Sequence, residues 1–203
     1  MNKGIIIKRA YDGAVLYEAP GAVTTKEAVE AAVFDNADLI NANLINADLS
    51  GARLFNARLD GAILVNAIFF NARLDGARLN GARLDGASLD GARLVDASLD
   101  NASLVDARLN EDTQLPTGER WSEYLRETLP ALLTAGGREL GEVATEEHWS
   151  CHDWANCPMH AAFGAEGISD VPILLRPRAE QFIQLFDARL IPLDAVSRIE
   201  EKS

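Results

Sequence analysis

Apolar residues recur at a spacing of five through the middle of the chain. Alanine stands at every fifth position from Ala37 to Ala107, and leucine follows two residues later from Leu39 to Leu109, with Phe69 the one exception. A period of five fits neither the 3.6-residue repeat of an α-helix nor the two-residue repeat of a flat β-strand. It predicts a chain that turns a corner every five residues and places alanine and leucine inward each time.

The residue before each alanine supports such corners. It is asparagine or glycine in most repeats, and aspartate at Asp96 and Asp106. These residues tolerate the backbone conformations that tight turns require. Fifteen repeats follow one another without slippage, and "AVFDN" at 32–36 fits as a sixteenth with Phe34 in the leucine place.

The repeats "ADLIN", "ANLIN", "ADLSG", "ARLDG" and "ASLVD" resemble the A(D/N)LXX motif of the pentapeptide-repeat family. The resemblance covers residues 32–111 and implies a mainly β fold, a right-handed quadrilateral β-helix with four repeats per coil and about four coils. Leucine would fill its centre, and alanine would pack beneath its corners. This sequence departs from the family motif where arginine or serine follows alanine, and where Phe69 replaces leucine.

Different patterns flank the repeats on either side. In residues 1–31, "KGIIIKRAYDGAVLYEA" predicts two strands joined at Asp12-Gly13. "TTKEAVEAAV" predicts a short helix, with Thr24 and Glu27 at capping-box spacing. The open end of a β-helix needs a cover, so we interpret residues 1–31 as an N-terminal hairpin and helix cap.

Residues 112–203 carry a helical rather than a five-residue pattern. Pro116 and Gly118 mark the change, and "ERWSEYLRETLPALLTAG" and "RPRAEQFIQLFDARL" have apolar residues at helical spacing. We expect a small, mostly helical C-terminal capping domain here. Residues 149–192 resemble uncharacterised phage-associated or bacterial pentapeptide-repeat proteins, which indicates a phage or prophage origin.

Several outward positions of the repeats are apolar, which is unusual for a monomeric surface. They are Phe55, Ile63, Val65, Ile68 and Phe70. One explanation is that the N- or C-terminal segment of this chain covers them, and the other is that they bind a protein partner. A second copy of the chain, giving a homodimer, is one such partner.

The charge pattern narrows the classes of partner. The formal net charge is −12, which argues against direct nucleic-acid binding. Arg53, Arg73 and Arg93 fall in one column at 20-residue spacing, and nearby aspartates predict either a self-neutralising face or an anion-binding row of arginines. There is no membrane-spanning stretch and no signal peptide, so we expect a cytoplasmic protein.

One segment, 147–164, has residues that could hold a metal. Five ligand candidates lie within thirteen residues: His148, Cys151, His152, Cys157 and His160. Zinc takes four nitrogen or sulfur donors in a tetrahedron, but the spacing matches no strong zinc motif. The alternative is that the cysteines are small buried apolar groups, and that the chain has no cofactor.

The functions that remain belong to three classes. The first is a non-enzymatic interaction module or scaffold, acting on a host protein if the origin is a phage. The second, implied by the family resemblance, is a DNA mimic that inhibits or protects type II topoisomerase (gyrase); a short rod with seven arginines against ten aspartates argues against it. The third is a structural or regulatory zinc module at 147–164. The sequence has no phosphate loop, nucleophile triad or paired-carboxylate site, so we expect no enzyme.

Overall fold

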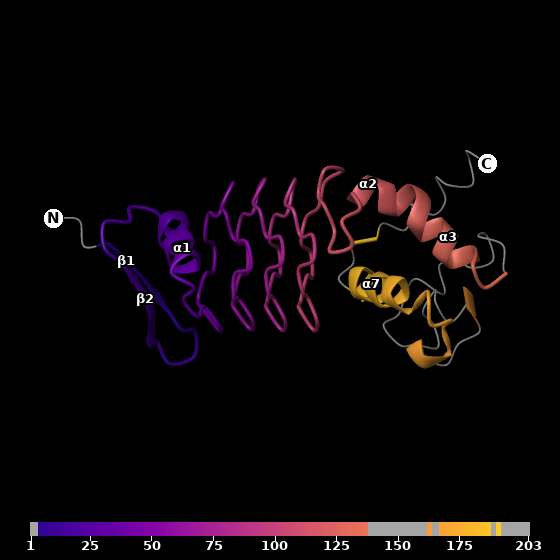
Figure 1. Cartoon of the computed structure of the whole chain (residues 1–203), viewed down its shortest axis with the longest axis horizontal. Helices are drawn as coiled ribbons and strands as arrows, with labels where there is room; N and C mark the ends of the chain where they lie inside the picture. Colours follow the sequence, from indigo (N-terminus) through magenta and orange to yellow (C-terminus); the bar gives the residue numbers. More distant parts are fainter. Residues whose placement is uncertain (1–3, 138–161, 164–166, 188–189, 192–203) are drawn as a thin grey trace. The chain divides into compact units, whose positions relative to one another are not determined.

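The computed structural model describes residues 4–137, 162–163, 167–187 and 190–191 (Figure 1). The chain divides into two compact units, Met1–Trp121 and Ser122–Ser203. The first unit contains strands β1 (Ile5–Lys8) and β2 (Val15–Ala19), helix α1 (Thr25–Phe34) and the five-residue repeats. The second unit is helical in its described part.

Parallel bridges join residues that lie 20 positions apart along the repeats. Arg53 pairs with Arg73, and Arg73 pairs with Arg93. The N–H of Leu54 donates to the carbonyl of Arg73 at 2.8 Å, and the N–H of Arg73 donates to the carbonyl of Ala52 at 2.8 Å. Each coil therefore contains four repeats, which gives the quadrilateral β-helix that the sequence predicts (Figure 1).

Each corner of the coil is a tight turn. The N–H of Ala57 donates to the carbonyl of Leu54 at 3.1 Å, and Asn56 between them has a φ of 56°. Every fifth residue from Asn36 to Asp106 has a positive φ in the same way. A four-residue β-turn closed by an i to i+3 hydrogen bond, with a positive φ at its third residue, matches the type II turn. Asparagine, aspartate and glycine adopt that conformation at the lowest cost, which explains their place before each alanine.

The leucine and alanine side chains fill the interior of the coils. Leu54, Leu64 and Leu74 have 0% exposure, and so has Phe69 in its leucine place. Burial of one such side chain contributes about 1.5–3 kcal/mol relative to exposure. The repeats therefore supply the core of the first unit, as the five-residue period predicts.

The N-terminal hairpin is joined to the first coil by backbone hydrogen bonds. β1 and β2 run antiparallel, and the chain beyond β1 continues along the β-helix edge. The N–H of Ala10 donates to the carbonyl of Asn41, and the N–H of Asn43 donates to the carbonyl of Lys8, both at 2.8 Å. These bonds pair part of an edge that would otherwise be open to another strand.

Helix α1 begins at the cap that the sequence predicts. The N–H of Glu27 donates to Oγ1 of Thr24 at 3.2 Å, and the Glu27 carboxylate accepts from the N–H of Val23 at 2.8 Å. The helix is tied to the β-helix by Lys26, whose Nζ donates to the carbonyl of Ser50 at 2.9 Å. Local capping and this long-range contact help to fix α1 beside the first coils.

The hydrogen-bonded ladder continues past the last regular repeat. The N–H of Leu94 donates to the carbonyl of Gln114 at 2.9 Å, one residue later than the regular step. Thr113 is fully buried, and Leu115 is 2% exposed. These two residues take the alanine and leucine places after a one-residue insertion. The sequence places the change of pattern at 111/112, whereas the ladder runs on through Pro116, whose carbonyl accepts from the N–H of Asp96.

A nearly continuous helical segment leads into the second unit. It consists of α2 (Trp121–Glu123), a π-helical turn (Tyr124–Thr128) and α3 (Leu129–Thr134). The wider turn precedes Pro130, which has no N–H to donate to the preceding turn.

The second unit also contains a 3₁₀ turn (Ile168–Asp170) and helix α7 (Arg176–Asp187), which contacts α3. Ala179, Phe182 and Leu185 are buried in α7, and the rings of Phe182 and Phe186 stack with centroids 5.7 Å apart. The helical C-terminal segment predicted from the sequence is therefore present. Among the described residues, no helix has the length and apolar character needed to cross a membrane.

Candidate protein-binding surfaces

The two residues that flank each buried leucine point away from the core and form columns along the β-helix. Arg53, Arg73 and Arg93 make one column, as their bridges show. A side chain at one of these positions can therefore meet its neighbour in the same repeat or a residue about 20 positions away. Both kinds of contact determine the charge of the faces.

Six of the seven arginines in the repeats form ion pairs with aspartates, at 2.9–3.6 Å: Arg58–Asp38, Arg73–Asp75, Arg78–Asp60, Arg83–Asp85, Arg93–Asp75 and Arg108–Asp90. Most arginines of the β-helix are therefore neutralised by aspartates, which favours the self-neutralising face over the anion-binding row of arginines. Within the described residues, Arg53 is the one arginine of the repeats without an ion pair.

The apolar residues predicted to bind a partner lie on three sides of the coil. The 20-residue period puts two of them on each of two neighbouring sides and one on a third side: Ile63 with Val65, Ile68 with Phe70, and Phe55. The first four therefore lie on the two sides of one corner, and Phe55 lies on the side that follows that of Phe70, one coil earlier.

The exposure of these side chains differs. Phe70 is 50% exposed and Ile68 is 42% exposed, while Phe69 between them is fully buried. Ile63 and Val65 are half-buried on the adjacent side. We call the exposed pair the Ile68–Phe70 surface. Its two side chains belong to one repeat and point to the same side, because residues two apart on an extended segment share a face.

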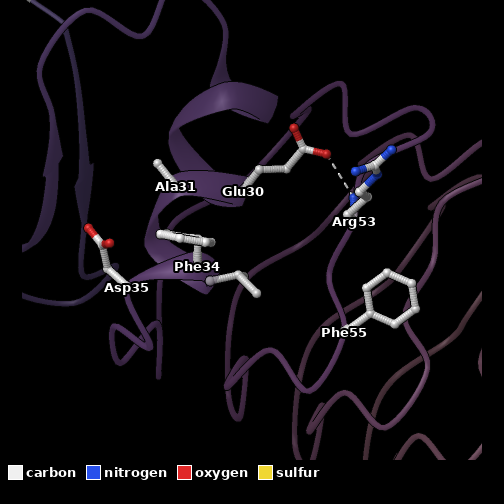
Figure 2. Close-up of a pocket in the computed structure, with 7 residues that line it drawn as sticks. Glu30, Ala31, Phe34, Asp35, Arg53 and Phe55 are labelled. Carbon is white, nitrogen blue, oxygen red and sulfur yellow. Dashed lines mark hydrogen bonds between the residues drawn. The ribbon is translucent and has the colours of Figure 1, made fainter.

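A pocket of about 610 Å³ lies between α1 and the β-helix (Figure 2). We call it the α1 pocket, and these residues line it: Glu30, Ala31, Val33, Phe34, Asp35, Arg53 and Phe55. Figure 2 shows Glu30, Ala31, Phe34 and Asp35 coming from α1 and its end, and Arg53 and Phe55 coming from the repeats. The α1 pocket thus combines apolar and charged groups from both parts of the first unit.

Two carboxylates of the α1 pocket accept hydrogen bonds, from Arg53 and from Tyr17. The Glu30 carboxylate accepts from the backbone N–H of Arg53 at 2.8 Å, drawn as the dashed line in Figure 2. The Asp35 carboxylate accepts from the Tyr17 hydroxyl at 2.5 Å, and this bond raises the pKa of Tyr17. The Arg73 guanidinium lies over the Phe55 ring, 4.5 Å from its centroid. The side chain of Arg53 is the group with unused donors.

Phe34 does not occupy the inward leucine place expected from "AVFDN". It is the last residue of α1 and is 85% exposed. The helix extends over residues whose spacing also fits the repeat, so the helical conformation turns the Phe34 ring outward. Extending the predicted helix to Phe34 would have put Glu30 and Phe34 on one helix face, because they are four residues apart.

The metal-ligand candidates His148, Cys151, His152, Cys157 and His160 lie outside the described residues. Within the described part of the chain, no three His, Cys, Asp or Glu side chains are grouped as a metal site. The zinc hypothesis therefore stays a prediction.

Comparison with known families agrees with this geometry. The family described as pentapeptide repeats (8 copies) matches residues 32–71 and again residues 72–110. Residues 32–110 are thus a run of pentapeptide repeats. The match ends where the regular five-residue step ends, just before the insertion that precedes Thr113. No curated protein matches the chain.

Several solved pentapeptide-repeat structures are similar to this chain over part of its length. Rfr23 from the cyanobacterium Cyanothece 51142 is 33% identical over 36% of this chain and 56% of its own, with a TM-score of 0.27. A thylakoid-lumen protein of Arabidopsis thaliana is 35% identical over 34% of this chain and 54% of its own, with a TM-score of 0.18. HetL of Nostoc sp. strain PCC 7120 is involved in heterocyst differentiation regulation. It is 25% identical over 41% of this chain and 55% of its own, with a TM-score of 0.18. The chain spans little more than half of each of these proteins.

Proposed function

We propose that this chain is a non-enzymatic protein-interaction module, in which a pentapeptide-repeat β-helix presents fixed surfaces to a protein partner. The Ile68–Phe70 surface carries the proposal. Phe70 is 50% exposed beside Ile68 at 42%, on a scaffold whose arginines are mostly neutralised. Aromatic residues, phenylalanine among them, are enriched at the cores of protein interfaces.

The charge arrangement favours this function over DNA mimicry. A DNA mimic needs rows of unpaired negative charge, whereas five of the ten aspartates within 35–110 each pair with an arginine, at 38, 60, 75, 85 and 90. The resemblance of residues 149–192 to uncharacterised phage-associated or bacterial pentapeptide-repeat proteins makes a host protein the partner if the origin is a phage. A second copy of the chain is the other partner to be distinguished.

The test compares the partner captured by three forms of the full chain. The native chain, a Phe70→Asp variant and a Val105→Asp variant are immobilised, and proteins retained from bacterial lysate are quantified by mass spectrometry. Val105 is a matched control because it is an exposed apolar residue, at 38%, on a different coil. Circular dichroism establishes that each variant keeps the β-helix.

We expect one protein to be retained by the native chain and by Val105→Asp, and to fall about thirtyfold with Phe70→Asp, as for loss of an interface anchor. Its binding is then measured with the purified protein. If that partner is retained equally by all three forms, the Ile68–Phe70 surface is not the interface. Light scattering tests whether the native chain is a homodimer. If the Ile68–Phe70 surface joins the two copies, Phe70→Asp should give a monomer.

A further inference from the structure

The α1 pocket contains a cation without an anionic partner. The other six arginines of the repeats are paired with aspartates, whereas the Arg53 guanidinium forms no ion pair among the described residues. Glu30 lies beside it, but its carboxylate accepts from the backbone N–H of Arg53 rather than from the side chain (Figure 2). An exposed guanidinium has five N–H donors in a geometry that suits a carboxylate.

The rest of the α1 pocket is suited to an apolar group. Phe34 is 85% exposed and Phe55 is 36% exposed, and Ala31 and Val33 add to the lining. An exposed phenylalanine at the rim of a pocket gains free energy only when a ligand removes its surface from water. A small inorganic anion would contact Arg53 but would leave both rings in water.

The charges in the α1 pocket also limit the charge of the ligand. Glu30 and Asp35 are on the α1 side, and Arg53 is on the side of the repeats. Arg73, over the Phe55 ring, is already paired with Asp75. A ligand with several negative charges would be repelled by the two carboxylates. One carboxylate at Arg53, with an apolar side chain next to it, matches both halves of the pocket.

We infer that the α1 pocket binds a segment of a partner protein in which an apolar side chain stands beside a carboxylate. This inference rests on the proposed function, because it assigns the chemistry of a protein ligand. The α1 pocket shares no residue with the Ile68–Phe70 surface, although the sides that carry Phe55 and Phe70 are neighbours. The two sites can therefore be tested independently.

The probe is a fluorescent hexapeptide with a single glutamate between two leucines, Ser-Gly-Leu-Glu-Leu-Gly, blocked at both ends. Its controls replace glutamate by glutamine or by lysine. Binding to the full-length chain is measured by fluorescence anisotropy, and its location by perturbation of backbone amide signals in NMR. We expect the glutamate peptide to bind, to shift signals in residues 30–35 and 53–55, and to bind more tightly than either control.

Three variants complete the test. Arg53→Gln should weaken binding of the glutamate peptide about tenfold, as for loss of a charge-assisted hydrogen bond. Arg58→Gln, which removes an arginine already paired with Asp38, should leave it unchanged. Glu30→Gln should tighten binding, because it removes a repelling charge while an amide oxygen remains to accept from the N–H of Arg53.

The results separate this inference from the proposed function. Equal binding of the three peptides, no detectable binding, or no effect of Arg53→Gln would overturn the inference. If Phe70→Asp abolishes peptide binding and Arg53→Gln does not, the ligand occupies the Ile68–Phe70 surface; the proposed function then stands and the inference about the α1 pocket is wrong. We expect the glutamate peptide to bind more weakly to the Arg53→Gln variant and to bind the Phe70→Asp variant as it binds the native chain.

Discussion

The side-chain amide of Asn71 occupies the space that a Cβ on Gly91 would need. The two residues are 20 positions apart and stand at the same corner of successive coils, both with positive φ. Gly61 above Asn41, Gly76 above Asn56 and Gly86 above Asn66 repeat the relationship. At these four corners the asparagine side chain of the preceding coil leaves no room for a Cβ and so favours glycine, although the turn itself also accepts asparagine or aspartate.

Gly91→Ala should destabilise the β-helix more than Gly81→Ala. Both glycines have a positive φ, of 69° and 66°, but a Cβ at Gly81 would meet nothing within 4 Å. We expect the strained φ to cost about 1–2 kcal/mol in each variant, and the displaced Asn71 amide to add about 1 kcal/mol for Gly91→Ala. Thermal unfolding followed by circular dichroism measures the difference.

The control for this prediction is the double variant Asn71→Gly with Gly91→Ala. Glycine accepts the φ of Asn71 and removes the side chain that obstructs a new Cβ. The additional cost should then disappear, leaving a stability loss from Gly91→Ala similar to that of Gly81→Ala. Equal losses from the two single variants would show that the asparagine imposes no constraint.

Asp75→Asn should destabilise the protein, whereas Asp38→Asn should have little effect. Asp75 pairs with both Arg73 and Arg93, and its side chain is 19% exposed. Asp38 pairs with Arg58 alone and is 50% exposed. Exposed single pairs contribute about 0–1 kcal/mol, and a half-buried carboxylate between two cations contributes more.

The measurement for the aspartate pair is the thermal midpoint of each variant at low and high salt. We expect the midpoint of Asp75→Asn to lie below that of the native chain, with a gap that narrows as salt screens the native pairs. A midpoint for Asp38→Asn lower than that for Asp75→Asn would contradict the role assigned to the two-arginine contact.

The corners and the core of the β-helix were predictable because each depends on residues close in sequence. Asn56 and Leu54 define a turn and a buried centre within one repeat, and the next repeat does the same. The one-residue insertion before Thr113 was missed because "TQL" preserves the alternation of buried and outward residues but not alanine, and because the step changes from 20 to 21 residues. A search for the alternation alone would have extended the ladder to Leu115.

The α1 pocket could not be predicted from the five-residue period. Phe34 fits the repeat spacing and the helical spacing equally well, and the helix prevails through the cap at Thr24 and the contacts of Lys26 and Glu30 with the coils. Those contacts depend on how α1 packs, which no local pattern specifies. The unpaired state of Arg53 likewise follows from which aspartates face each arginine in three dimensions.

The pKa of Asp12 should lie below its ordinary value in the folded protein. Arg9 donates to both oxygens of this carboxylate, at 3.0 Å and 2.6 Å, and this bond is the main cause of the lowered pKa. A carboxylate with a lowered folded pKa stabilises the fold above its unfolded pKa of about 3.9, and this contribution is lost as pH falls through the folded value.

An NMR titration of the Asp12 carboxyl carbon checks this directly. Arg9→Gln should raise the pKa of Asp12 toward its ordinary value and should remove the part of the acid sensitivity that comes from this pair. The hydrogen bond from the N–H of Ala14 to Asp12 remains in the variant and keeps the pKa slightly low. An unchanged titration of Asp12 in Arg9→Gln would show that the pair does not persist in solution.

Phe69 and Phe70 are adjacent, but substitution by alanine should lower stability at Phe69 and weaken partner binding at Phe70. Phe69 fills the centre of its coil at 0% exposure, so Phe69→Ala should leave a cavity and cost about 3–5 kcal/mol in stability. Phe70 is half exposed, so Phe70→Ala should cost less than about 1 kcal/mol and chiefly weaken partner binding. Thermal unfolding measures the first property, and retention of the captured partner measures the second. A large stability loss with Phe70→Ala would mean that its ring packs within the fold, and the Ile68–Phe70 surface would then lose its aromatic anchor.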